Sequence, residues 1–365
     1  MENINFFSTN ISSDVYGNLK KVLESGFISA GKQSELFESK LSNIGLVNPV
    51  TVNSGTITMF LALLSHNIGD GDEVIIPAQT FVATGLVVKQ VGAKVVFADI
   101  NPNTGNIDVS SIKSKINSKT KAIIPVHWGG YPCDMDEIND LAKKNNLIVI
   151  EDAAHALGST YKNKPIGSIS DFTSFSFQAI KQLTTGDGGA LCCLDEEKYN
   201  LIKNLRWFGI DRDNSTPTIL GEREYDLNCV GYKSHMNDLA ATIGISNLTD
   251  FEKNLERNRF IAKMYDESLY DVKGLKNLNY EQDRESSYWL YPIIVENREQ
   301  FIYKLKNKNI PTSVVHLGID KNSIFGGKDN TLKNQRYFDE HQLHLPINPS
   351  MTDEQLNYII KTIKE

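Results

Sequence analysis

Short apolar segments of strand length alternate with helical segments between residues 50 and 195. The strand-like segments are almost continuously apolar and rich in Val and Ile, which is typical of strands buried on both faces. This alternation predicts an α/β fold in which helices cover both faces of a parallel sheet. The clearest strands are 74–76, 94–97, 122–126 and 147–150, and the clearest helices are 57–65, 83–91 and 135–145.

A second pair of strand-like segments, 172–177 and 189–194, flanks a polar, glycine-rich loop of the kind that often carries chemistry. A long, charged helical segment then runs from 237 to about 269. The rest of the chain predicts a strand at 288–295, a helix at 298–308, a strand at 312–317 and a helix from Thr352. We therefore expect a large, mostly parallel sheet domain spanning 1–245 and a smaller α+β domain spanning 246–365.

The composition narrows the choice of partners. The 365 residues are 40% hydrophobic and 23% charged, and 38 Lys and Arg against 45 Asp and Glu give a net charge of −7. An acidic chain without a basic block offers no broad surface to nucleic acid or to an anionic membrane. No apolar run approaches the roughly 20 residues that a spanning helix needs, and the N-terminus does not resemble a secretory signal. We expect a soluble, cytoplasmic protein whose four cysteines, which lack CxxC spacing, are reduced and bind no metal.

Candidate chemistry lies at the ends of the apolar strands. The motifs of dinucleotide-binding, P-loop and zincin proteins are absent from the sequence. Instead, Glu151 and Asp152 directly follow the strand 147–150, and Lys181 lies in the loop after the strand 172–177. The run Asn53-Ser54-Gly55-Thr56 opens a predicted helix.

These residue types meet the requirements of pyridoxal 5′-phosphate (PLP). PLP needs a lysine for a Schiff base, a carboxylate that keeps its ring nitrogen protonated, and donors for its phosphate. Lys181 is a candidate for the first role, and Asp152, at the carboxyl end of a strand where open α/β sheets bind ligands, for the second. The start of the helix at Gly55, the Thr56 hydroxyl and Ser176 are candidates for the third.

Each of these residues also has an ordinary structural interpretation. A loop lysine is usually solvated, and an acid after a strand can cap a helix. His155 can be an ordinary hydrogen-bonded histidine, and Phe81 can belong to the core. The occurrence of Lys181 together with Asp152 favours the cofactor site over these readings.

Taken together, the motifs resemble those of the DegT/DnrJ/EryC1/StrS family of sugar aminotransferases, which are PLP-dependent enzymes with the type I, aspartate-aminotransferase-like fold. The resemblance covers nearly the whole chain and rests on the combination of motifs. The matching runs are Phe27-Ile28-Ser29-Ala30-Gly31, Pro77-Ala78-Gln79-Thr80-Phe81-Val82-Ala83-Thr84, Pro125-Val126-His127-Trp128-Gly129-Gly130, Glu151-Asp152-Ala153-Ala154-His155, Phe175-Ser176-Phe177, Lys181, Gly186-Asp187-Gly188-Gly189 and His344-Leu345-Pro346.

The resemblance implies a role for each candidate. Lys181 would carry the Schiff base and act as general base, Asp152 would pair with the pyridinium nitrogen, and His155 would lie near the phenolic oxygen. Phe81 would stack on the cofactor ring. The residues implied to bind the phosphate are Ser54, Gly55, Thr56 and Ser176.

One segment departs from the family pattern. The family often completes the phosphate site with an asparagine of the neighbouring subunit, in a Gly-Tyr-Asn-Tyr-Arg-Met run. The run here is Gly231-Tyr232-Lys233-Ser234-His235-Met236, so Lys233 stands where asparagine is common. A lysine can serve a phosphate as a point charge, and we expect a homodimer in which Lys233 crosses the subunit boundary. An exposed charge at a helix start is the alternative.

The resemblance also implies a reaction, the transfer of an amino group from glutamate to a keto sugar linked to a nucleotide, in polysaccharide or glycoconjugate biosynthesis. Arg206, Arg212 and Arg223 are candidates for binding a diphosphate, and His316 lies where the small domain of the family approaches substrate. An aminotransferase of a cyclitol ketone or of a small phosphorylated ketone, and a PLP-binding regulatory protein without turnover, remain alternatives. Lys181 argues against the related dehydratases, which have His at that position.

Overall fold

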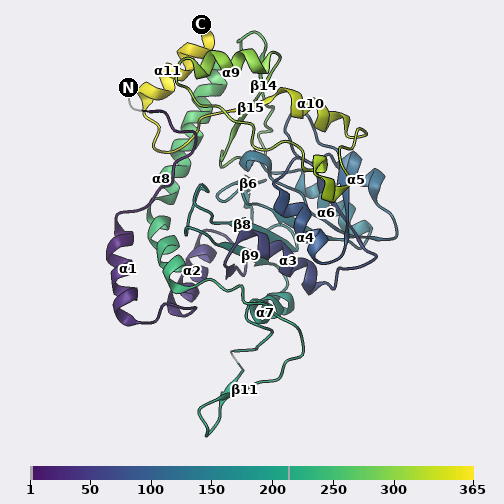
Figure 1. The fold of residues 1–365 in the computed structure, drawn as a ribbon, viewed down its shortest axis with the longest axis vertical. Coiled ribbons are helices and arrows are strands. Elements are labelled where there is room, and N and C mark those ends of the chain that lie inside the picture. The colour runs from purple at the N-terminus through teal and green to yellow at the C-terminus, as the bar shows by residue number, and fades with distance from the viewer. Residues whose placement is uncertain (1–2, 213) are drawn as a thin grey trace.

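A seven-stranded sheet forms the centre of the protein in the computed structural model, which describes residues 3–212 and 214–365 (Figure 1). The strand order is β1-β9-β8-β5-β4-β2-β3. Strand β9 runs antiparallel to both of its neighbours, and the other strands run parallel. The strands are β1 (Val50–Val52), β2 (Glu73–Pro77), β3 (Lys94–Ala98), β4 (Thr120–Ile123), β5 (Ile148–Asp152), β8 (Phe172–Ser176) and β9 (Gly189–Cys193).

Helices cover both faces of this sheet, as the apolar strands predict. Alternate side chains of β2 point to opposite faces, because successive residues of a strand do so. Val74 and Ile76 pack with α3, α4 and α7, whereas Ile75 packs with α2, α5, α6 and α8. The helices are α2 (Lys32–Asn43), α3 (Gly55–Ser65), α4 (Val82–Gln90), α5 (Val109–Lys115), α6 (Met135–Lys144), α7 (Glu196–Leu205) and α8 (Asp238–Leu269). The predicted α/β class is confirmed.

The long helix α8 connects this sheet to a smaller one. Its N-cap is Asn237, whose side chain accepts a hydrogen bond from the Ala240 amide. The first half of α8 packs against α1 (Asp14–Ser25) and α2, and its second half packs on an antiparallel sheet of order β12-β14-β15. The elements of this part are β12 (Leu275–Asn277), β14 (Tyr291–Val295), α9 (Arg298–Lys306), α10 (Lys333–His341), β15 (Gln342–Leu345) and α11 (Asp353–Lys364). The division at 245/246 falls inside α8 and stays a prediction.

The strand predicted at 312–317 is wrong. Within the described residues this segment makes one isolated ladder contact, between Ser313 and His344. Two further backbone groups of the segment bind side chains, since Val315 N–H donates to His344 Nδ1 and the His316 carbonyl accepts from Gln79 and Gln342. The strand predicted from 288 begins at 291.

Smaller elements complete the fold. Strand β6 (Thr160–Tyr161) pairs with both β7 (Lys164–Pro165) and β13 (Arg284–Glu285). A hairpin of β10 (Thr216–Pro217) and β11 (Arg223–Glu224) extends from the body beyond α7 (Figure 1). Among the described residues, no helix is long and apolar enough to cross a membrane, and no three His, Cys, Asp or Glu side chains group to hold a metal ion.

Candidate active site

A cavity of about 460 Å³ lies at the carboxyl edge of the central sheet. The ends of β5 and β8 and the start of α3 form one side of it, and segments from the smaller sheet and the N-terminus close the other. Eight of the nine residues predicted from the sequence line it, namely Ser54, Gly55, Thr56, Phe81, Asp152, His155, Ser176 and Lys181. Lys233 is exposed and lies outside it.

Asp152 ends β5, and hydrogen bonds orient its carboxylate. Thr84 Oγ1 donates to Oδ2 over 2.7 Å, and the Ala154 amide donates to Oδ1 over 3.2 Å. Burial raises the pKa of Asp152, while the bonds from Thr84 and Ala154 and the charge of Lys181 oppose the rise. The carboxylate is therefore fixed in direction and surrounded by groups that favour its charged form.

Lys181 lies in the loop after β8, against an aromatic wall that Trp289 and Phe7 form. Its Nζ is 3.6 Å from the ring centroid of Trp289, whose indole N–H donates to the Ile180 carbonyl over 2.8 Å. Burial lowers the pKa of Lys181 to about 7, although the charge of Asp152 acts in the opposite direction. A large fraction of this amine is therefore neutral and nucleophilic near neutral pH.

His155 stacks on the ring of Trp289 as well. Its ring lies 3.8 Å from that of Trp289, with an angle of 20° between the planes. Burial, and next the charge of Lys181, lower the pKa of His155 well below its usual value, so the imidazole is neutral. His155 Nδ1 is buried and has no hydrogen-bond partner among the described residues. A ligand in the cavity can supply that partner.

The start of α3 and the end of β8 approach each other closely. A Cβ at Gly55 would lie 2.8 Å from Cβ of Ser176, and one at Gly189 would lie 2.7 Å from the Gly55 amide nitrogen. Ser54 is the N-cap, and its hydroxyl accepts from the Ile57 amide over 3.3 Å. Glycine at both positions thus lets a helix N-terminus and the Ser176 hydroxyl share one corner, which suits a phosphate.

Phe81 and His316 form the mouth of the cavity. Phe81 is 53% exposed, and its ring lies 5.1 Å from that of His316. Burial, and next the charge of Lys181, lower the pKa of His316 to about 4. Phe81 is therefore not a core residue, which removes the ordinary alternative for it.

The arginines expected to bind a diphosphate are away from this cavity. Arg206 forms an ion pair with Glu38 and donates to the Thr51 carbonyl over 2.8 Å. Arg212 and Arg223 belong to the segment that carries the hairpin, and all three arginines line a separate cavity.

Three residues at the site were not assigned a role from the sequence. Thr84 ends one of the runs that match the family, and this position in a motif is the feature of the sequence that could have identified it as a site residue. Trp289 and Phe7 form a stacked pair with ring centroids 5.3 Å apart and line the cavity. Their aromatic character does not separate them from core residues in the sequence.

The residues of the cavity fit PLP. A largely neutral lysine, an oriented carboxylate and a glycine-lined helix N-terminus match its aldehyde, ring nitrogen and phosphate. The unpartnered His155 Nδ1 adds a polar atom that a ligand would satisfy. The arrangement supports amine chemistry at Lys181.

Comparison with known proteins agrees with this geometry. Residues 9–364 match the DegT/DnrJ/EryC1/StrS aminotransferase family. The chain is 36% identical to the spore coat polysaccharide biosynthesis protein SpsC of Bacillus subtilis, over 97% of this chain and 95% of that protein. It is 34% identical to GDP-perosamine synthase of Escherichia coli O157:H7, over 95% and 94%. The PLP form of Spr1654 from Streptococcus pneumoniae superposes with a TM-score of 0.91 at 32% identity, covering 99% of this chain and 98% of that one. The chain belongs to the DegT/DnrJ/EryC1/StrS aminotransferase family and is a PLP-dependent sugar aminotransferase.

Proposed function

We propose that Lys181 is the covalent anchor of PLP and that Asp152 holds the proton on the ring nitrogen. The observation that carries this proposal is the convergence of Lys181, Asp152 and the start of α3 on one cavity. PLP, when bound, supplies an electron-withdrawing ring that makes the α-hydrogen of an amino acid acidic.

The side chains of the cavity transfer the proton, orient the cofactor, exclude water and bind the phosphate. Lys181 Nζ, with a pKa of about 7, can take a proton from carbon and return it near neutral pH. Asp152 keeps its orientation through Thr84, and His155 offers a neutral nitrogen beside the ring site. The aromatic wall of Trp289 and Phe7 keeps water from the Lys181 amine. The start of α3 and Ser176 bind the phosphate.

The substrate that we propose is a nucleotide-linked keto sugar, with glutamate as amino donor. Support comes from the name of one relative, GDP-perosamine synthase, and from the polysaccharide role in the name of another. We propose that the amino sugar is made in the cytoplasm. The four cysteines, all of which lie within the described residues, are free thiols, as is usual for proteins of that compartment.

Single-turnover absorbance tests the proposal. Glutamate added to the holoenzyme should abolish the visible band of the bound aldehyde form, and a nucleotide-linked keto sugar should restore it. Lys181→Ala should lose the covalent adduct that borohydride fixes in the wild type. Retention of that adduct in Lys181→Ala would refute the assignment, and restoration by a cyclitol ketone but by no nucleotide sugar would refute the substrate class.

We also propose a homodimer in which Lys233 completes the phosphate site of the partner. Lys233 is exposed and is not among the residues that line the cofactor cavity of its own chain. The segment after α1 carries Phe27 and Ile28, which are 82% and 45% exposed, and apolar side chains of this kind mark interaction surfaces.

Subunit mixing tests the homodimer. A mixed dimer of Lys181→Ala and Lys233→Ala chains contains one site with both lysines only if the two lysines of a site come from different chains. Mixing should therefore raise activity above that of either variant. The control is Lys181→Ala mixed with Lys263→Gln, a change at an exposed lysine of α8. No gain over the separate Lys233→Ala variant would contradict the cross-subunit role.

A further inference from the structure

A small cavity, of about 30 Å³, adjoins the cofactor cavity. The two cavities share four lining residues, which are Phe7, Ile180, Lys181 and Trp289. The small cavity is also lined by a set of side-chain amides, those of Asn10, Gln182, Asn254, Asn258 and Asn348. We call it the asparagine cavity. Lys181 therefore borders the cofactor cavity and the asparagine cavity at once.

The asparagine cavity extends from the surface toward Lys181. Asn10 of the N-terminal segment and Asn254 of α8 are partly exposed at its outer end. Asn258 is only 7% exposed. Residues four apart are neighbours on one face of a helix, so Asn254 and Asn258 line the same wall. The lining thus passes from partly exposed amides to a buried amide.

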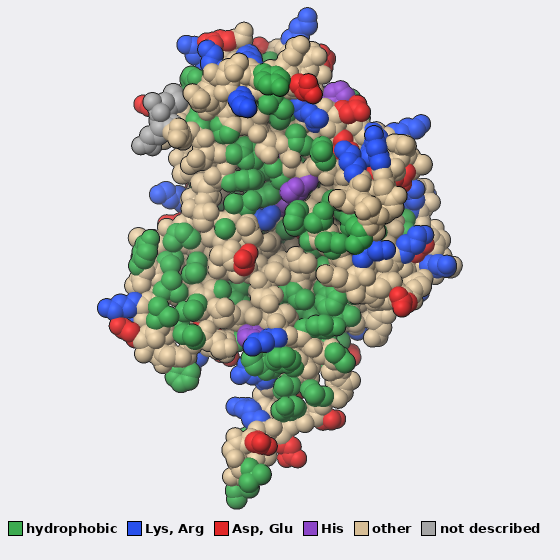
Figure 2. All heavy atoms as spheres, in the orientation of Figure 1, with side chains coloured by type: hydrophobic (Ala, Val, Ile, Leu, Met, Phe, Trp, Pro, Cys, Tyr) green, Lys and Arg blue, Asp and Glu red, His purple; other side chains and the backbone are tan. Residues whose placement is uncertain are grey.

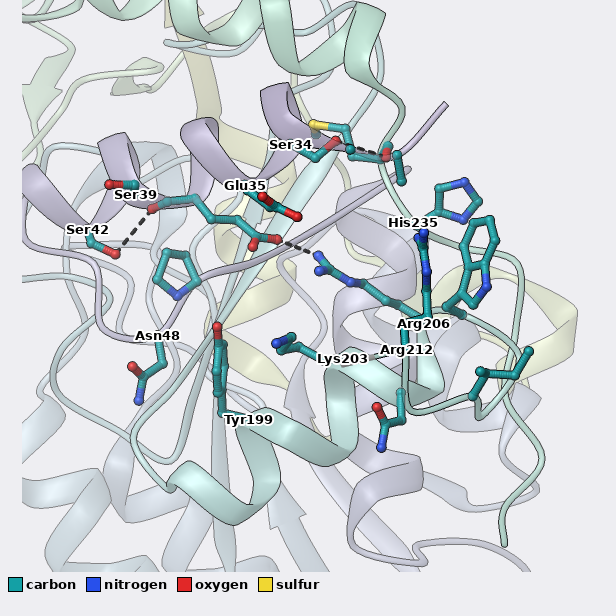
Figure 3. A pocket seen from close by; sticks show the side chains of 18 of the residues that line it. Ser34, Glu35, Ser39, Ser42, Asn48, Tyr199, Lys203, Arg206, Arg212 and His235 are labelled. Atoms are coloured by element: carbon teal, nitrogen blue, oxygen red, sulfur yellow. Dashed lines mark hydrogen bonds and ion pairs between the residues drawn. The ribbon is translucent and has the colours of Figure 1, made fainter. Parts of the chain in front are cut away.

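The lining is polar and nearly uncharged. Of the described residues that line the asparagine cavity, Lys181 alone has an ionisable side chain. The basic cavity of the protein is a different one, at the base of the β10–β11 hairpin, which Lys203, Arg206 and Arg212 line (Figure 3). Lys and Arg side chains also gather there in the surface view (Figure 2). Amide donors and acceptors around one amine suit a neutral ligand instead.

The volume restricts that ligand to water. Sites for organic molecules usually measure about 300–1,000 Å³, and the asparagine cavity measures about 30 Å³. A water molecule needs about 10–15 Å³ and two to four polar partners. The cavity therefore has room for about two water molecules.

Asn258 offers an acceptor to such a water molecule. Its Oδ1 is buried and has no hydrogen-bond partner among the described residues, while its Nδ2 donates to the Tyr288 carbonyl over 3.4 Å. The neighbouring Asn348 is instead engaged on both sides, since it donates to the Asn5 carbonyl over 2.9 Å and accepts from Ser350 Oγ over 2.7 Å. A buried carbonyl oxygen without a hydrogen bond is costly, and buried water commonly supplies the bond.

Lys181 offers the second partner. Its amine has a pKa of about 7, so near neutral pH it can both donate to water and accept from it. The wall of Trp289 and Phe7 keeps bulk water from this amine, but both rings also line the asparagine cavity. Water that enters between the amides would therefore lie beside Lys181.

We propose that the asparagine cavity binds water at Asn258 and is the route by which Lys181 exchanges protons with solvent. The proposal rests on the proposed function, in which Lys181 Nζ takes a proton from the α-carbon of glutamate and returns one. While Nζ holds that proton, one N–H proton passes to the bound water and the water gives another proton back. This exchange is balanced, because no charge, atom or electron is gained or lost.

A single-turnover half-reaction with α-deuterated glutamate in ordinary water tests the route. Mass spectrometry of the pyridoxamine form of the cofactor then measures how much deuterium was returned to it. An ammonium group that rotates freely but exchanges with no water returns about one third of the label, because one of its three hydrogens is deuterium. The wild type should return less. Asn258→Leu, which removes the acceptor and fills the cavity, should raise the returned fraction toward that value.

Three further variants separate the route from general damage to the fold. Asn258→Ser keeps a polar group and leaves room for water, so it should exchange as the wild type does. Asn277→Leu is the matched control, because Asn277 Oδ1 is also buried without a partner among the described residues but Asn277 lines neither of these two cavities. Asn254→Leu, at the partly exposed outer end, should raise the returned fraction even if Asn258→Leu fails to fold.

A high-resolution crystal structure of the wild type, with or without PLP, is the second measurement. It should show water within hydrogen-bond distance of Asn258 Oδ1. A dry cavity, or an equal returned fraction in the wild type and the two leucine variants of α8, would overturn the proposal. Absence of any glutamate half-reaction in the wild type would refute the proposed function instead, and the crystal structure would still decide whether the asparagine cavity binds water.

Discussion

The hydrogen bond from Thr84 to Asp152 offers a direct test of how the cofactor cavity works. Thr84→Val keeps the shape of a buried side chain and removes the hydroxyl that donates to Asp152 Oδ2 over 2.7 Å. This bond is the largest of the effects that oppose the rise in the pKa of Asp152 caused by burial. Without it, the pKa of Asp152 should rise further, and its charged form should hold the ring proton less well.

The size of the effect follows from the charge of the acceptor. A hydrogen bond to a charged group contributes about 1.5–3 kcal/mol. At about 1.4 kcal/mol for each factor of ten, Thr84→Val should lower PLP affinity, or the rate of the glutamate half-reaction, by about 10- to 150-fold. The apoprotein should also lose about 1–3 kcal/mol of stability, because Thr84 Oγ1 lies 2.6 Å from buried Thr80 Oγ1 as well, and its removal leaves both Asp152 and Thr80 without this partner.

The assay is a PLP titration of the apoprotein followed by visible absorbance, together with a single-turnover reaction with glutamate. Thr242→Val is the matched control, since Thr242 is a buried threonine of α8 whose Oγ1 donates to the Asp238 carbonyl over 2.6 Å. It should lose about 0.5–1.5 kcal/mol of stability and keep full cofactor affinity. Wild-type affinity and rate in Thr84→Val would refute the reasoning that Thr84 tunes Asp152.

Three other predictions concern the same region. Borohydride-fixed capture of PLP by the apoprotein should speed up as pH rises through about 7, where Lys181 loses its proton, and then level off; a midpoint near the ordinary lysine value would contradict the burial argument. Gly55→Ala should cost about 1–3 kcal/mol and weaken PLP binding, because its Cβ would lie 2.8 Å from that of Ser176. Gly17→Ala, in open space on α1, should instead be neutral or stabilising in the same thermal and PLP titrations. Glu151→Ala should cost about 1–3 kcal/mol in urea unfolding, because it leaves buried His127 without its 2.7 Å partner and buried Thr173 without its 3.1 Å partner; an unchanged unfolding midpoint would show that these bonds contribute little.

The sequence predicted the central sheet well for a physical reason. Strands such as β2 and β5 are buried on both faces, so their apolar runs identify them without knowledge of their neighbours. The segment 312–317 has the same β-branched character, yet its backbone binds the side chains of Gln79 and Gln342. Those partners come from distant parts of the chain, and no local pattern reports them.

The candidate site also combines residues that the local sequence predicts with residues that only long-range packing brings in. Asp152 and Ser176 end β5 and β8, and Lys181 follows β8 in the chain. Because the carboxyl ends of parallel strands meet at one edge of a sheet, the proximity of these residues could be predicted. Trp289 and Phe7 reach the cavity only because the smaller sheet and the N-terminal segment pack over it. Long-range packing of this kind is not encoded in the local sequence.

Burial shifts the pKa values of Lys181 and Asp152 in opposite directions, and the aromatic wall of Trp289 and Phe7 contributes to that burial. Removal from water lowers the pKa of the Lys181 amine and raises that of the Asp152 carboxyl, so it moves both toward their neutral forms. The mutual attraction of Lys181 and Asp152 acts against both changes, and the Thr84 bond acts against the change at Asp152. The charge of Asp152 leaves the amine with a pKa of about 7 rather than lower. Trp289 and Phe7 line the cavity that holds both groups, and the Trp289 ring centroid lies 3.6 Å from the Lys181 amine. The aromatic wall therefore acts on the chemistry of Lys181 as well as on the packing of the fold.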